Sequence, residues 1–204
     1  MKNFKLILGL VLFIAFALFI YRTSVFRISK NFGVVEDGKL YRSAQLTTAE
    51  LEEAIEKYKI KTVISLRGSP AGTSYYETEA VTLERLHVHF IPVALRDETY
   101  PDETKLKEIF HQFDHGEYPM LIHCRVGADR TGLIAALYQR SYMNKTLAEA
   151  EKQLSFRNWH LSFLKPAMNL FLHKFQGVNW VMTDYHVCSP EFDDYRETDY
   201  VCKK

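Results

Sequence analysis

Met120-Leu121-Ile122-His123-Cys124-Arg125-Val126-Gly127-Ala128-Asp129-Arg130-Thr131-Gly132 runs from a short apolar segment into a polar loop. The apolar segment predicts a buried strand, and the long apolar segment that begins at Leu133 predicts a buried helix. The loop between them is therefore expected at the carboxyl end of a strand and the amino end of a helix. Open α/β sheets bind ligands at such positions. Unpaired N–H groups and the helix macrodipole also attract anions there, so the stretch predicts an anion-binding loop.

The rest of the chain alternates short β-branched segments with amphipathic segments. This alternation predicts an α/β fold, a single domain whose central, mostly parallel twisted sheet of four to five strands is flanked by helices on both faces. The expected strands lie at 34–35, 40–42, 62–66, 87–93 and 120–123. The expected helices lie at 48–58, 75–86, 102–116, 131–143, 146–155 and 163–175.

The first 30 residues differ from the rest in composition. They hold five basic residues and no acidic one, and Leu6 to Tyr21 is an uninterrupted apolar segment flanked by Lys5 and Arg22. Sixteen helical residues span roughly 24 Å, slightly less than the ~30 Å hydrocarbon core of a bilayer. The segment predicts a transmembrane or signal helix. We favour an uncleaved anchor over a cleaved signal peptide, for which Ala15-Phe16-Ala17 would be the cleavage pattern.

The remaining chain carries 21 of the 26 basic residues and all 25 acidic ones, a net charge of −4. This balance, without a run of lysine or arginine, gives no reason to expect nucleic-acid binding. We expect an anchor and linker at 1–30, a globular domain at 31–178 and an acidic, aromatic tail at 179–204. The flanking charges do not orient the anchor, and export is the default for such a leader. The prediction is a domain held at the inner (cell) membrane on its periplasmic, extracytoplasmic side, of open oligomeric state.

The chain contains three cysteines, Cys124, Cys188 and Cys202. An odd count fits one disulfide and one free reactive thiol. If the domain is exported, Cys188 and Cys202 pair and hold the tail; in a cytosolic domain all three thiols remain free. The sequence leaves these two alternatives equal.

Cys124 is the residue of the loop that can attack phosphorus as a thiolate. The helix N-terminus, the loop amides, His123 and Arg130 all favour the ionised thiol. Arg130 is also placed to hold two phosphate oxygens in a bidentate pair, and the Thr131 hydroxyl can donate to the departing thiolate. No metal ion or cofactor is expected, because loop amides and a guanidinium stabilise the equatorial oxygens. The predicted phosphate-binding residues are Arg125, Val126, Gly127, Ala128, Asp129 and Arg130.

A leaving oxygen needs a proton donor from another loop, and such a general acid contributes about 10²–10⁴-fold in rate. Four carboxylates lie between the strand expected at 87–93 and the following helix: Asp97, Glu98, Asp102 and Glu103. Asp97 is the predicted acid because it lies on the loop between strand and helix. Asp102 is better explained as the N-cap of that helix and is the alternative.

His123-Cys124-x-x-Gly127-x-x-Arg130-Thr131-Gly132 resembles the signature loop of cysteine-dependent tyrosine and dual-specificity phosphatases. Residues 40–44, 61–66 and 132–138 are also similar to segments of small bacterial dual-specificity-like phosphatases, some of which are exported to the periplasm. The resemblance implies that Cys124 forms a phosphocysteine and that Arg130 binds phosphate. It also implies that His123 orders the loop, that Thr131 helps to expel the thiolate and that Asp97 is the acid.

We therefore expect a phosphatase that acts on phosphotyrosine, and also on phosphoserine and phosphothreonine, in proteins that include membrane-associated ones. Arg125, directly after the cysteine, also occurs in similar phosphatases that act on phosphoinositides, so inositol phosphates are the alternative substrate. Two further alternatives are a non-catalytic phosphate-binding module and a rhodanese-like sulfurtransferase. The sulfurtransferase loops usually lack the Gly-x-x-Arg-Thr-Gly run found here.

Overall fold

The computed structural model describes residues 2–198 and 202, and a five-stranded sheet forms the centre of its domain. The strand order is β1-β2-β5-β3-β4, with β1 antiparallel to β2 and all other pairs parallel. This arrangement confirms the mostly parallel sheet predicted from the sequence. The strands are β1 (Gly33–Glu36), β2 (Leu40–Ser43), β3 (Thr62–Ser65), β4 (His89–Pro92) and β5 (Met120–His123).

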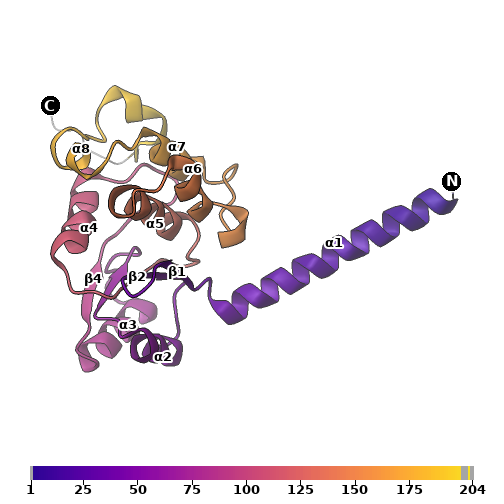
Figure 1. Cartoon of the computed structure of the whole chain (residues 1–204), viewed down its shortest axis with the longest axis horizontal. Coiled ribbons are helices and arrows are strands. Elements are labelled where there is room, and N and C mark those ends of the chain that lie inside the picture. Colours follow the sequence, from indigo (N-terminus) through magenta and orange to yellow (C-terminus); the bar gives the residue numbers. More distant parts are fainter. Residues whose placement is uncertain (1, 199–201, 203–204) are drawn as a thin grey trace.

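Helices cover both faces of the sheet (Figure 1). Alternate residues of β5 point to opposite faces, as the period of a strand requires. Leu121 joins a core with α2 and α3, whereas Ile122 joins the larger core with the other domain helices. Every residue of β5 is buried, because both faces are covered. The helices are α2 (Thr48–Tyr58), α3 (Ser74–Arg85), α4 (Glu103–His115), α5 (Asp129–Tyr142), α6 (Leu147–Ala150), α7 (Pro166–Lys174) and α8 (Val178–Thr183).

Local sequence signals set several helix boundaries. Thr47 and Glu50 form the capping box of α2, as predicted. Asp102 caps α4 by accepting hydrogen bonds from the N–H groups of Thr104 and Lys105, which confirms its predicted structural role. The helix expected at 163–175 begins only at Pro166, because proline is favoured in the first helical turn.

Two predicted elements are shorter in the structure. The helix expected at 146–155 consists of α6 followed by a 3₁₀ turn, Glu151–Gln153. The strand expected from His87 begins at His89, because His87 has a left-handed backbone (φ 54°) that turns the chain out of α3.

The segment 179–198 packs into the larger core of the domain. Its contacts reach the loop between β4 and α4, where the N–H of Tyr100 donates to Tyr195 O at 2.8 Å. Cys188 and Cys202 form a disulfide with their Cα atoms 5.7 Å apart. The segment expected as a tail therefore covers the loop that carries Asp97. Its buried members are Val181, Tyr185, Val187 and Phe192.

α1 (Lys2–Ser29) projects away from the domain (Figure 1). Its segment Ile7–Val25 has a mean hydropathy of 2.1, and none of it is buried. By length and composition it is a candidate membrane span or signal helix. The helix ends at Ser29, and the left-handed backbones of Lys30 and Asn31 (φ 50° and 53°) turn the chain into β1.

Candidate active site

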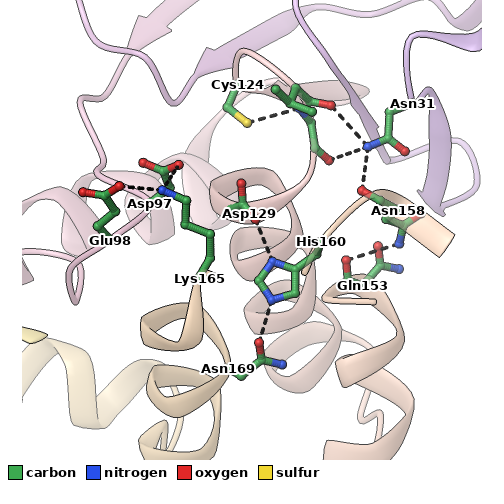
Figure 2. A network of polar contacts seen from close by, with 12 residues as sticks. Asn31, Asp97, Glu98, Cys124, Asp129, Gln153, Asn158, His160, Lys165 and Asn169 are labelled. Atoms are coloured by element: carbon green, nitrogen blue, oxygen red, sulfur yellow. Dashed lines mark hydrogen bonds and ion pairs between the residues drawn. The ribbon is translucent and has the colours of Figure 1, made fainter. Parts of the chain in front are cut away.

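Cys124 lies at the carboxyl end of β5, and the following loop wraps around its sulfur before α5 begins at Asp129. The side chain is buried, and the N–H of Gly127 donates to its Sγ at 3.2 Å (Figure 2). Loop N–H groups and a helix N-terminus attract anions. The structure therefore places the sulfur of Cys124 within an anion-attracting loop.

Gly127 allows this loop to lie directly against the end of β2. Its φ is +70°, a conformation that side chains disfavour. A Cβ at this position would lie 2.6 Å from the backbone atoms Ser43 O and Ala44 N. Any other residue would push the loop away from the sheet, so the N–H that reaches the sulfur depends on glycine.

Arg42 of β2 lies beneath the loop, and its place in the sequence did not suggest a role in the site. It donates from Nη2 to the carbonyl of Gly127 and from Nη1 to Gln153 Oε1 at 2.6 Å. Burial lowers the pKa of Arg42 to about 10, while the charge of Cys124 acts in the opposite direction. A buried guanidinium thus holds the loop and favours negative charge on the sulfur. The feature that could have indicated this role for Arg42 is an arginine within a buried parallel strand.

Asn31 is a second residue whose part in the site the sequence did not reveal. Its Nδ2 lies 2.9 Å from Gly127 O, 3.3 Å from Val126 O and 3.0 Å from Asn158 O (Figure 2). The C=O and N–H of a trans peptide point in opposite directions. Because Asn31 holds the carbonyl of Val126, it directs the N–H of Gly127 toward the Sγ of Cys124.

Asn31→Ala is expected to reduce kcat/KM roughly tenfold, since one or two loop hydrogen bonds are lost. Alkylation of Cys124 by iodoacetamide at neutral pH should slow in parallel, because the thiolate loses an oriented donor. Asn31→Asp keeps the shape but cannot donate, so it should behave like alanine. Asn158→Ala is the matched control, because within the described residues its side chain donates to Lys152 O and Gln153 O and not to the loop. Unchanged alkylation in both Asn31 variants would contradict this role.

His123 is buried at the end of β5 and faces α3. Its Nε2 lies 3.0 Å from Glu79 Oε1, and the two side chains are only 2% and 4% exposed. The pair joins α3 to the strand that carries the cysteine. The structure thus gives His123 a partner, Glu79, which the sequence did not single out.

Arg130 lies in the first turn of α5, and its Nη1 donates to Leu66 O at 3.2 Å and to Leu95 O at 3.3 Å. These carbonyls follow β3 and β4, so they hold the guanidinium at the carboxyl edge of the sheet. Its Nε and the Oγ1 of Thr131 are buried and have no hydrogen-bond partner within residues 2–198 and 202. Buried polar atoms without partners suit a site that receives an anion.

A basic rim surrounds the loop. The Cζ of Arg67 lies 3.2 Å from the centre of the Tyr75 ring, and its Nη1 donates to Gln45 Oε1 at 2.9 Å. Burial lowers the pKa of Arg67, and the positive charges of Arg130 and Arg125 lower it further. Arg125 itself is exposed. Tyr75 and Glu79 act in the opposite direction, and the three neighbouring guanidiniums favour an anion at the loop.

Asp97 lies on the loop after β4 and is held by a residue that the sequence did not suggest, Lys165. The Nζ of Lys165 lies 3.1 Å from Asp97 Oδ2 and 2.7 Å from Glu98 Oε1 (Figure 2). Burial raises the pKa of Asp97, but the hydrogen bond and charge of Lys165, together with Arg130, hold it below its ordinary value. The charge of Arg130 therefore reaches Asp97, and its role as the acid stays a prediction.

Asp129 uses its side chain within the fold. Its Oδ1 lies 2.7 Å from His160 Nδ1, and His160 Nε2 lies 2.6 Å from Asn169 Oδ1 of α7 (Figure 2). His160 is buried. The carboxylate of Asp129 therefore ties the start of α5 to α7, and its predicted contact with phosphate stays a prediction.

The residues predicted for the site thus come together at one edge of the sheet. Within residues 2–198 and 202, no group of three or more histidine, cysteine, aspartate or glutamate side chains is arranged to hold a metal ion. The chemistry that the arrangement supports uses a buried sulfur, loop amides, arginines and a nearby carboxylate.

Comparisons with known proteins concern the family and the fold. The model of a tyrosine phosphatase family matches residues 27–143. No curated protein matched the chain. Among solved structures, Pseudomonas aeruginosa TpbA is 20% identical, covers 72% of this chain and 86% of its own, and has a TM-score of 0.60. The catalytic domain of the Saccharomyces cerevisiae PP-IP phosphatase SIW14 is 18% identical, covers 72% and 85%, and has a TM-score of 0.59. At these identities the two structures establish a shared fold.

Proposed function

The chain belongs to the tyrosine phosphatase family, and from this premise we propose that it hydrolyses phosphotyrosine in proteins, with phosphoserine and phosphothreonine as further substrates, through a phosphocysteine intermediate. One observation supports this proposal most: a loop N–H donates to the buried sulfur of Cys124, and the Nε of Arg130, six residues further on, is buried without a hydrogen-bond partner among the described residues. A thiolate and an anion-binding group at one place are what nucleophilic attack on a phosphate ester requires.

In the proposed first step, the Sγ of Cys124 attacks phosphorus, the S–P bond forms and the bond from phosphorus to the ester oxygen breaks. Asp97 donates its proton to the departing oxygen, while the loop amides and Arg130 hold the equatorial oxygens. In the second step, water attacks phosphorus, Asp97 accepts the proton and the S–P bond breaks. The Thr131 hydroxyl then donates to the released thiolate.

Two observations support different substrates. A variant of TpbA has been crystallised with pTyr, and here the stack of Arg67 on Tyr75 offers an aromatic wall beside the loop. SIW14 is described as a PP-IP phosphatase, and the basic rim of Arg67, Arg125 and Arg130 suits a polyanion. Inositol phosphates are therefore the second candidate.

Phosphate release from a panel of substrates separates the two. We expect kcat/KM for a phosphotyrosyl peptide to exceed that for phosphoseryl peptides and inositol polyphosphates at least about tenfold. Arg125→Ala should affect inositol polyphosphates more than the peptide, because only the polyanion needs the extra charge. Arg85→Gln, in α3, is the matched control. If the wild type prefers inositol polyphosphates and Arg125→Ala loses that preference, inositol phosphates and not phosphotyrosine are the substrates.

We also propose that α1 is an uncleaved anchor and that the domain lies outside the cytoplasm, where phosphorylated membrane proteins are its partners. The disulfide between Cys188 and Cys202 supports this location, since disulfides persist in oxidising compartments. A reporter enzyme that is active only outside the cytoplasm, fused to the C-terminus, tests this location of the domain.

A further inference from the structure

A groove of about 250 Å³ separates the end of α1 from the domain. Cys124 is not among the residues that line it. One wall consists of Tyr21, Arg22 and Val25 of α1. The other consists of Asn31, Arg157 and Trp159.

Arg22 fixes the depth of this groove relative to a membrane. It is the first charged residue after the apolar segment that ends at Tyr21, and such residues lie at the level of the lipid headgroups. Its Nη2 donates to Phe156 O at 3.0 Å, and its guanidinium lies 4.6 Å from the centre of the Phe156 ring and 5.8 Å from that of Trp159. The turn at 156–159 therefore lies at headgroup level as well.

The charges in the groove are positive. Arg22 and Arg157 line it, and no aspartate or glutamate is among its described lining residues. The Nε of Arg22 is buried and has no hydrogen-bond partner in the part of the chain that the structure describes. Guanidiniums bind phosphate oxygens through paired N–H donors, so this composition fits a phosphate group.

The segment that begins at Phe156 also suits a lipid surface. Phe156 contacts Arg22 and is 53% exposed, and Phe163 and Leu164, further along the chain, are 77% and 60% exposed. Aromatic and aliphatic side chains next to arginines are the usual composition of a protein surface at the membrane interface. Tyr21 and Trp159 add two aromatic rings to the walls of the groove itself.

We propose that this groove binds the headgroup of an anionic phospholipid, with Arg22 and Arg157 on its phosphate. The inference rests on the proposal that α1 is an anchor, but it does not depend on the catalytic roles. Asn31 lines the same groove and donates to the carbonyls of Val126 and Gly127. A bound headgroup therefore lies against the residue that positions the catalytic loop.

The test uses the full chain in detergent micelles with added phosphatidylglycerol or phosphatidylcholine, and native mass spectrometry counts the retained lipid. We expect retention of phosphatidylglycerol over phosphatidylcholine, with a loss of about fivefold for each of Arg22→Gln and Arg157→Gln. Arg157 is exposed on the domain, so its variant keeps both fold and anchor. Arg85→Gln removes an exposed arginine that pairs with Glu52 and is the matched control.

Two outcomes would overturn the proposal: equal retention of both lipids, or wild-type retention of phosphatidylglycerol by the double variant of Arg22 and Arg157. Soluble glycerophosphoglycerol, the headgroup without acyl chains, should compete weakly, and full competition would instead indicate a site for free phosphate esters. Hydrolysis of p-nitrophenyl phosphate is measured on the same samples. If the wild type retains phosphatidylglycerol through these arginines but does not hydrolyse p-nitrophenyl phosphate, the proposed catalysis is refuted while the proposed lipid site stands.

Discussion

Cys124→Ser is expected to lower kcat for p-nitrophenyl phosphate by roughly 10⁴-fold or more, the scale of removing a nucleophile from a covalent mechanism. A serine hydroxyl stays protonated near neutral pH, so the Gly127 N–H that now reaches the sulfur has no anion to stabilise. Serine is slightly smaller than cysteine and fits the same buried space, so the fold should persist. Rapid acid quenching with labelled substrate should trap a phosphoprotein in the wild type and none in the variant.

Ligand binding supplies the control for this variant. The loop amides and the unpartnered Nε of Arg130 remain in Cys124→Ser, so inorganic vanadate or phosphate should still raise its melting temperature. EDTA is expected to leave the wild-type rate unchanged. Wild-type activity in the serine variant would refute the phosphocysteine mechanism.

Asp97→Asn is expected to lower kcat/KM for a phosphotyrosyl peptide by about 10²–10⁴-fold, the usual contribution of a general acid. The loss should be smaller for p-nitrophenyl phosphate, whose leaving group departs readily without a proton. Glu98→Gln is the matched control, since Glu98 shares the partner Lys165 but has no proposed part in proton transfer. Equal losses for both substrates would argue against proton donation by Asp97.

The pH dependence tests the same residue through Lys165. Asp97 donates only while protonated, so its contribution falls as pH rises through its pKa. Burial raises that pKa, but Lys165 and Arg130 hold it below its ordinary value. Lys165→Gln removes one positive charge and should move the alkaline limb of kcat/KM to higher pH. Asp97→Asn should abolish that limb, and a limb that survives in Asp97→Asn would assign it to another group.

The geometry of the candidate loop was largely predictable because it is local in sequence. Cys124 and Arg130 lie six residues apart on one loop, so their proximity follows from a tight turn between a strand and a helix. The capping residues Thr47 and Asp102 acted as predicted, since capping depends on only the next few residues. Apolar periodicity likewise indicated the strands and most of the helices.

The supporting residues were not predictable from local pattern. Asn31, Arg42 and Lys165 reach the site from the end of α1, from β2 and from the start of α7. They come together because β2 lies beside β5 in the sheet, and because the turns after α6 fold back under the loop. Residues far apart in sequence are joined only by strand order and packing, which hydrophobic periodicity does not encode.

The sequence by itself determined the class of fold and the phosphate-binding loop, since both rest on patterns of about a dozen consecutive residues. The tertiary structure alone decided how that loop is held: Asn31 and Arg42 bind its carbonyls, and the N–H of Gly127 donates to the sulfur of Cys124. It also decided that residues 178–198 cover the loop of Asp97, and that Lys165 binds this carboxylate. The physical reason is that orienting a peptide or shifting a pKa takes contacts between side chains that only the folded chain brings within hydrogen-bond distance.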